Sequence, residues 1–236
     1  MIHSLELRFA DLHPDGTAEE RVRYVQSQIL RRARRLVDYR ALERLASEQC
    51  PQISAMLITH KSWKERGVNT GYYGPITDYL RSASNILDIG CGLNPLYVLS
   101  NYDNLKSYCC VEPDKRIVQV LKSVCAKISQ CQMTFFNGKI EAVVHEMDGT
   151  FDFVFVQKLI PLLIQKREGA ALHSIGHVIS GYALLTCNLV SLSRDCSIVT
   201  EESLALNKFC QMEGLVRLAE FNGTGEFGYV VRKELK

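Results

Sequence analysis

Short apolar runs alternate with longer amphipathic stretches from residue 86 onward. The apolar runs predict buried strands at 86–89, 105–112, 133–136, 151–156 and 182–187. Between them, apolar residues at helical spacing predict helices around 94–101, 114–129, 138–147 and 165–177. Strands that alternate with helices indicate a parallel, doubly wound sheet.

Two more apolar runs near the end of the chain have a different connection. Residues 215–221 and 227–233 are joined by the turn-forming segment Asn222-Gly223-Thr224-Gly225-Glu226, which predicts a hairpin. The sequence therefore predicts an α/β, Rossmann-like fold whose mostly parallel sheet ends in an antiparallel hairpin.

The first 80 residues show a helical pattern instead. Thr17 and Glu20 form a capping box, and apolar residues recur at near-helical spacing as far as Gln49. Pro51 ends that run, and glycines at 67, 71 and 74 mark a loop before a last helical stretch at 76–82. We expect a small helical subdomain over 1–80 and the α/β domain over 81–236.

Composition narrows the class of protein. The chain has 236 residues, 47% of them hydrophobic and 23% charged, which is typical of a folded globular protein and not of a disordered or coiled-coil one. Its net charge is only +2, so a nucleic-acid surface would need uneven charge placement. Such uneven placement occurs at Arg31, Arg32, Arg34 and Arg35, which form either a surface that binds RNA phosphates or an ordinary solvated helix face.

The cysteines and the longest uncharged run favour a cytoplasmic protein. Nine cysteines, an odd number without a C-x-x-C pair, predict reduced thiols and no metal site. The uncharged run 169–193 contains histidines, Asn188 and several serines, so we interpret it as a packed helix and strand and not a membrane span. Residues 1–20 contain five acidic groups, which disfavours a signal peptide.

A glycine-containing loop follows the first predicted strand. Its sequence, Asp88-Ile89-Gly90-Cys91-Gly92-Leu93-Asn94-Pro95, places two glycines where ligands of open α/β sheets bind. The third glycine of dinucleotide-binding loops is missing, which disfavours a pyrophosphate ligand. Glu112 ends the second strand and can accept hydrogen bonds from the ribose hydroxyls of an adenosine. This combination is similar to the S-adenosylmethionine site of class I methyltransferases.

Three segments narrow the resemblance. They resemble signatures of the 16S rRNA guanine-N7 methyltransferases that confer aminoglycoside resistance. The segments are His60-Lys61-Ser62-Trp63-Lys64-Glu65-Arg66, the loop from Leu87 to Leu96, and the segment from Phe151 to Pro161. The resemblance implies S-adenosyl-L-methionine as cofactor and 16S rRNA within the 30S subunit as partner.

The resemblance also implies roles for individual residues. Cofactor contacts fall on His60, Ser62, Arg66, Asp88, Gly90, Cys91, Gly92, Asn94, Pro95, Glu112 and Gln157. His60 and Ser62 are equally suited to local hydrogen bonds. Substrate RNA contacts fall on Arg31, Arg32, Arg34, Arg35, Lys158, Ser191, Ser193 and Arg194. Lys158 and Gln157 are the candidate catalytic residues and act by positioning, because guanine N7 has a lone pair and no proton to remove.

Two segments depart from the family pattern and leave the substrate open. Thr186-Cys187-Asn188 stands where the family often has Ser-Phe-Pro, and Arg194-Asp195-Cys196-Ser197 replaces a glycine-containing basic stretch. Two alternatives therefore remain: a class I methyltransferase for another RNA or a small molecule, and a non-catalytic RNA-binding relative.

Overall fold

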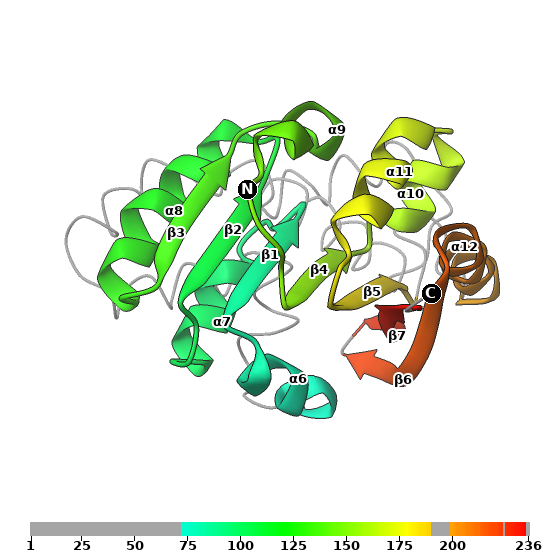
Figure 1. Ribbon diagram of the computed structural model, residues 1–236, viewed down its shortest axis with the longest axis horizontal. Helices are drawn as coiled ribbons and strands as arrows, with labels where there is room; N and C mark the ends of the chain where they lie inside the picture. The colour runs from blue at the N-terminus through cyan, green and yellow to red at the C-terminus, as the bar shows by residue number, and fades with distance from the viewer. Residues whose placement is uncertain (1–71, 190–198, 224, 235–236) are drawn as a thin grey trace, which may run out of the picture.

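A mixed β-sheet forms the centre of the molecule (Figure 1). The computed structural model describes residues 72–189, 199–223 and 225–234, and within them the sheet has seven strands in the order β3-β2-β1-β4-β5-β7-β6. The strands are β1 (Asn85–Ile89), β2 (Ser107–Val111), β3 (Gln132–Phe136), β4 (Phe153–Gln157), β5 (Tyr182–Asn188), β6 (Leu215–Gly223) and β7 (Glu226–Lys233). Strands β1 to β5 pair in parallel, whereas β7 runs antiparallel to both β5 and β6.

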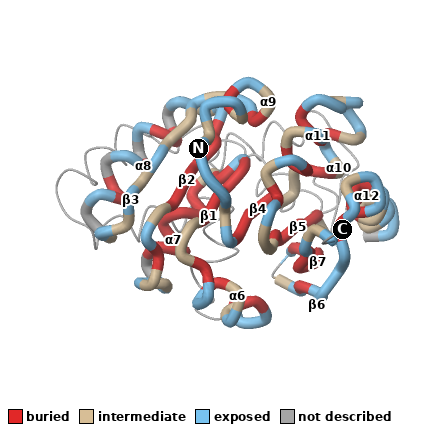
Figure 2. Tube along the Cα trace, in the orientation of Figure 1, coloured by how far each residue is buried: buried red, intermediate tan, exposed pale blue. Residues whose placement is uncertain are grey.

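Helices cover both faces of the sheet and give a three-layer arrangement. On one face lie η1 (Gly74–Ile76), α6 (Thr77–Ser82), α7 (Asn94–Asn101) and α8 (Lys115–Ile128). On the other lie α9 (Ile140–Val143), η2 (Val144–Glu146), α10 (Ile160–Gln165), α11 (Gly169–Val178) and α12 (Val199–Glu213). Because successive side chains of a strand point to opposite faces, each strand contributes to both layers. Figure 2 shows the resulting burial, with the central strands buried and outer helix surfaces exposed.

The predicted fold class is confirmed, and so are the five parallel strands and the final hairpin. The predicted helix over 165–177 is confirmed from residue 169 onward as α11. Its predicted start was wrong, because the chain makes a turn in which Arg167 has a left-handed φ of 58°, and the preceding helix α10 was not predicted. Helix α12 was not predicted from the pattern. Its buried face holds Leu206, Phe209 and Cys210, but apolar Leu204 and Met212 are exposed on the opposite side and weaken the contrast between an apolar and a polar face.

The residues before β1 are part of the core. Tyr72, Tyr73, Ile76 and Leu80 are at most 2% exposed and pack with α7 and the sheet. The boundary at residue 80 stays a prediction, since residues 1–71 lie outside the described part. Within the described ranges, no helix combines the length and hydropathy needed to cross a membrane. The same ranges contain no cluster of three metal-ligating His, Cys, Asp or Glu residues.

Candidate functional site

The loop between β1 and α7 folds over the carboxyl end of β2. Gly90 and Gly92 have φ values of +67° and +50°, which glycine adopts without the steric cost of a side chain. The Gly90 N–H donates to the Val111 carbonyl at 2.8 Å, and the Gly92 N–H donates to Oε2 of Glu112 at 3.0 Å. The loop and the acidic residue that the sequence singled out are therefore in direct contact.

Glu112 is held firmly at the end of β2. Its Oε1 accepts the Asp114 N–H at 2.9 Å, and its carbonyl accepts a bond from Asn137 Nδ2, also at 2.9 Å. Glu112 is 7% exposed, so it lies at the edge of the core. A carboxylate offers about four acceptor positions, which leaves capacity for the hydroxyls of a ribose.

A chain of buried polar groups lies beneath the loop. Oδ2 of Asp88 accepts bonds from Tyr108 OH at 2.7 Å and from Asn94 Nδ2 at 2.8 Å. Tyr73 OH then donates to Asn94 Oδ1 at 2.6 Å and accepts from Gln157 Nε2 at 2.9 Å. This Asp88 network ties β1, β2, α7, β4 and the segment before η1 together. It therefore fixes the position of the loop from below.

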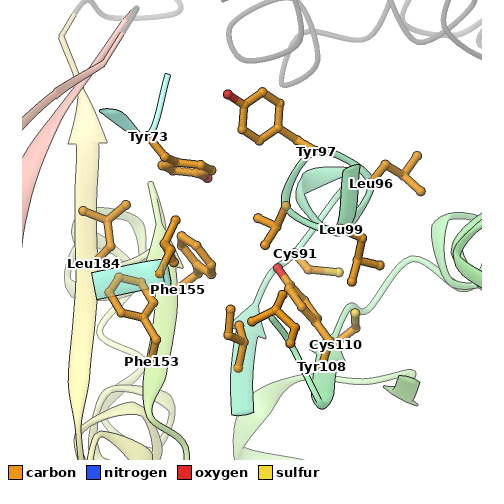
Figure 3. Packing of buried hydrophobic residues seen from close by; sticks show 14 of the residues in the cluster. Tyr73, Cys91, Leu96, Tyr97, Leu99, Tyr108, Cys110, Phe153, Phe155 and Leu184 are labelled. Atoms are coloured by element: carbon orange, nitrogen blue, oxygen red, sulfur yellow. The ribbon is translucent and has the colours of Figure 1, made fainter. Parts of the chain in front are cut away.

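Burial decides the protonation of the groups around this network. The pKa of Tyr108 lies well above its usual value because of burial and the nearby Asp88 carboxylate, so Tyr108 remains a neutral donor. Burial likewise raises the pKa of Cys91, which packs beside Cys110 and Tyr108. Figure 3 shows these three side chains under α7, with the Tyr73 ring over Phe155. The Cys91 thiol is thus a packing group and a poor nucleophile.

Lys158 follows β4 directly and has unusual backbone geometry. Its φ is 58°, a left-handed value uncommon for residues other than glycine. Its N–H donates to the Thr186 carbonyl at 3.0 Å, and its Nζ lies 3.0 Å from Oε1 of Glu226. The other carboxylate oxygen of Glu226 accepts a bond from Thr186 Oγ1 at 2.7 Å.

The structure brings together the predicted residues Asp88, Gly90, Cys91, Gly92, Asn94 and Glu112. Gln157 joins them through Tyr73, Pro95 is buried in the first turn of α7, and Lys158 lies at the end of the adjacent strand. The remaining predicted residues lie outside the described part of the chain: Arg31, Arg32, Arg34, Arg35, His60, Ser62, Arg66, Ser191, Ser193 and Arg194.

Sequence reasoning missed four residues of this region: Tyr73, Tyr108, Thr186 and Glu226. Tyr73 and Tyr108 resemble ordinary aromatic core residues, and no local pattern marks their hydroxyls as partners of a network. Glu226 lies beside a hairpin turn, where a carboxylate normally faces solvent, yet it is fully buried.

The strand order and the loop after β1 define the class of fold. It is the class I methyltransferase fold, as comparison with solved structures shows. No protein-family model and no curated protein matches the sequence.

The particular structures that resemble this chain include rRNA methylases. The 16S rRNA methylase ArmA has a TM-score of 0.64 and 22% identity, covering 83% of this chain and 98% of that one. The 16S rRNA methyltransferase RmtF, in complex with S-adenosyl-L-homocysteine, has a TM-score of 0.61 and 16% identity, covering 99% and 90%. The mitomycin 7-O-methyltransferase MmcR has a TM-score of 0.52 and 14% identity, covering 82% and 60%. At these identities the likeness establishes the fold.

Proposed function

We propose that this chain is an S-adenosylmethionine-dependent methyltransferase that modifies guanine N7 of 16S rRNA in the 30S subunit. The observation that carries the proposal is the contact between the Gly92 N–H and the Glu112 carboxylate at the carboxyl edge of the sheet. A glycine loop beside a carboxylate that suits the hydroxyls of a ribose supports an adenosine-containing cofactor.

The residues present fit that cofactor. Glu112 has acceptor capacity for the ribose hydroxyls, and an added Cβ at Gly90 or Gly92 would meet no protein atom closer than 3.8 Å. His60, Ser62 and Arg66 are assigned to the cofactor by the family resemblance, with Arg66 suited to the methionine carboxylate. When bound, S-adenosylmethionine supplies an activated methyl group on a sulfonium sulfur.

The chain's own contribution is to position the target base. Guanine N7 carries a lone pair and no proton, so methyl transfer to it requires no general base from the protein. Gln157 and Lys158 follow one another at the end of β4, beside the Asp88 network and the glycine loop. They are therefore suited to orient the base, with Lys158 donating to a base oxygen or a phosphate.

One observation favours ribosomal RNA, and a second favours RNA over a small molecule. The matching regions cover 98% and 90% of the rRNA methylases ArmA and RmtF but 60% of the O-methyltransferase MmcR. The arginines at 31, 32, 34 and 35 provide sequence-independent attraction to phosphates, and Ser191, Ser193 and Arg194 complete the proposed RNA contacts. A role in aminoglycoside resistance and a cytoplasmic location are part of the same proposal.

The test is transfer of a tritiated methyl group from S-adenosylmethionine to purified 30S subunits, with free 16S rRNA and tRNA in parallel. We expect labelling of 30S, followed by chemical cleavage at one modified guanine. Glu112→Ala should abolish labelling, whereas the same change at exposed Glu146 should not. Absence of 30S labelling by protein that binds the cofactor would refute the rRNA proposal.

The same assay separates the alternatives. The departures at 186–188 and 194–197 motivate a second candidate, a class I methyltransferase for another RNA or a small molecule. Labelling of tRNA or of a small-molecule panel, without labelling of 30S, would support that candidate. Cofactor and RNA binding without transfer to any of these would support a non-catalytic relative.

A further inference from the structure

A buried carboxylate and an outward-reaching lysine form an ion pair beside the proposed transfer site. Glu226 is fully buried, while the Lys158 side chain keeps 20% of its surface exposed. Their charged atoms lie 3.0 Å apart, and Thr186 binds the second oxygen of Glu226. One end of the pair is therefore anchored in the core, and the other lies at the surface of the sheet edge.

The topology brings these groups to one edge and one face. Strand β7 runs antiparallel, so its first residue, Glu226, lies where the parallel strands β4 and β5 end. Alternation along the strands places Gln157, Thr186 and Glu226 on the face that Phe155, Leu184 and Val230 share with Tyr73. Glu226 thus lies on the same face as the Asp88 network.

The ion pair of Lys158 and Glu226 has two features that indicate a functional role and not a stabilising one. Burying two opposite charges is costly, so an ion pair of this kind is weak evidence of stabilisation. Lys158 also adopts a left-handed backbone conformation, which the two bonds from its N–H to Thr186 maintain. Sparsely populated backbone conformations held by surrounding contacts concentrate at functional sites.

We propose that Glu226 is a positioning residue for methyl transfer: it holds the Lys158 ammonium in place to contact the target nucleotide, and Thr186 orients Glu226. The inference rests on the proposed function and deepens it. The charge balance gives the physical reason. Positive charge passes to the guanine ring when N7 gains a methyl group, and a lone ammonium nearby would oppose that change. Paired with Glu226, Lys158 donates a hydrogen bond without adding net charge at the site.

The test compares Glu226→Gln, Lys158→Met and the double variant, with Glu220→Gln as the matched control. Glu220 lies on the same hairpin but is exposed. The readouts are kcat and KM for the RNA, the Kd for S-adenosylmethionine, and Tm. We expect Glu226→Gln to lower kcat by about 10- to 100-fold, the scale expected for a misplaced positioning group. The cofactor Kd should stay within about twofold, because Glu226 is outside the glycine loop.

The double variant distinguishes positioning from a purely structural role. If Glu226 acts through Lys158, adding Glu226→Gln to Lys158→Met changes kcat little further. Thr186→Val removes the hydroxyl that donates to Glu226 without changing the charge and should lower kcat, whereas Thr186→Ser keeps that hydroxyl and should retain the wild-type rate. This pair tests the inference even if Glu226→Gln fails to fold.

Three results would overturn the inference. They are a Glu226→Gln enzyme as fast as the wild type, independent effects of the two single variants on kcat, and a loss of kcat that follows Tm alone. A wild-type protein that binds the cofactor and methylates nothing would instead refute the proposed function, and the inference with it. Wild-type activity therefore separates the two failures.

Discussion

The Asp88 network should contribute measurably to stability, and Tyr108→Phe tests this with a single-atom change. Tyr108 is completely buried, and its hydroxyl donates to the Asp88 carboxylate at 2.7 Å. The variant keeps the ring and its packing, so the lost hydrogen bond is the main change. A hydrogen bond to a charged group contributes about 1.5–3 kcal/mol, and a buried acceptor that loses a donor retains its desolvation cost.

Asp88 keeps its bond from Asn94 in this variant, so we expect a loss near the middle of that range. A loss of about 2 kcal/mol in the free energy of unfolding corresponds to a fall in Tm of about 4–8 °C for a chain of this size. The measurement is urea and thermal unfolding followed by circular dichroism. An unchanged urea m-value would indicate that the loss arises in the folded state.

The matched control is Tyr79→Phe, the same chemical change at a half-buried tyrosine whose ring packs against Tyr182. We expect it to alter stability by no more than about 0.5 kcal/mol. Asn94→Ala combined with Tyr108→Phe should give a non-additive loss, because both residues bind the same carboxylate oxygen. If Tyr108→Phe were as stable as the control, the reasoning about the network would be wrong.

Three further predictions concern the loop, the thiols and one carboxylate. Gly92→Ala places a side chain at φ +50° with no protein atom within 4 Å of its Cβ, so it should cost only about 1–2 kcal/mol of stability. Its effect on the free energy of S-adenosylmethionine binding, measured by calorimetry, should be larger than that loss of stability. Burial raises the pKa of Cys109, Cys125 and Cys187 to about 12, so these thiols should resist iodoacetamide at pH 8 in the native state and react in urea, as mass spectrometry would show. Burial also raises the pKa of Glu202 above its ordinary 4.5, so the native state holds that proton more tightly than the unfolded state. The stability that this proton contributes is present below pH 4.5 and is lost as pH rises through the raised pKa of Glu202. Urea titrations should therefore show Glu202→Gln becoming more stable relative to the wild type from acidic to neutral pH. A difference in stability that stays constant with pH would contradict this.

The sequence alone predicted the fold class and the glycine loop after the first strand, because both depend on local patterns. The short continuous apolar runs are typical of buried strands, and strands that alternate with helices are typical of a parallel sheet. Gly90 and Gly92 indicate a tight turn because they directly follow the first predicted strand. Glu112 marks the end of the second predicted strand. The structure adds the contact between Gly92 and Glu112, since β1 and β2 are neighbouring parallel strands that end at the same edge.

Only the tertiary structure decided how that loop is supported and what holds Lys158. Tyr73 and Gln157 are 84 residues apart in the chain, and Thr186 and Glu226 are 40 apart. Their contacts depend on strand order and register, which local patterns do not encode. The hairpin was predictable, but the placement of β7 next to β5 was not, and only that placement brings Glu226 to the carboxyl edge. A side chain at a turn faces water or the core according to what packs over it, and that is a property of the assembled sheet.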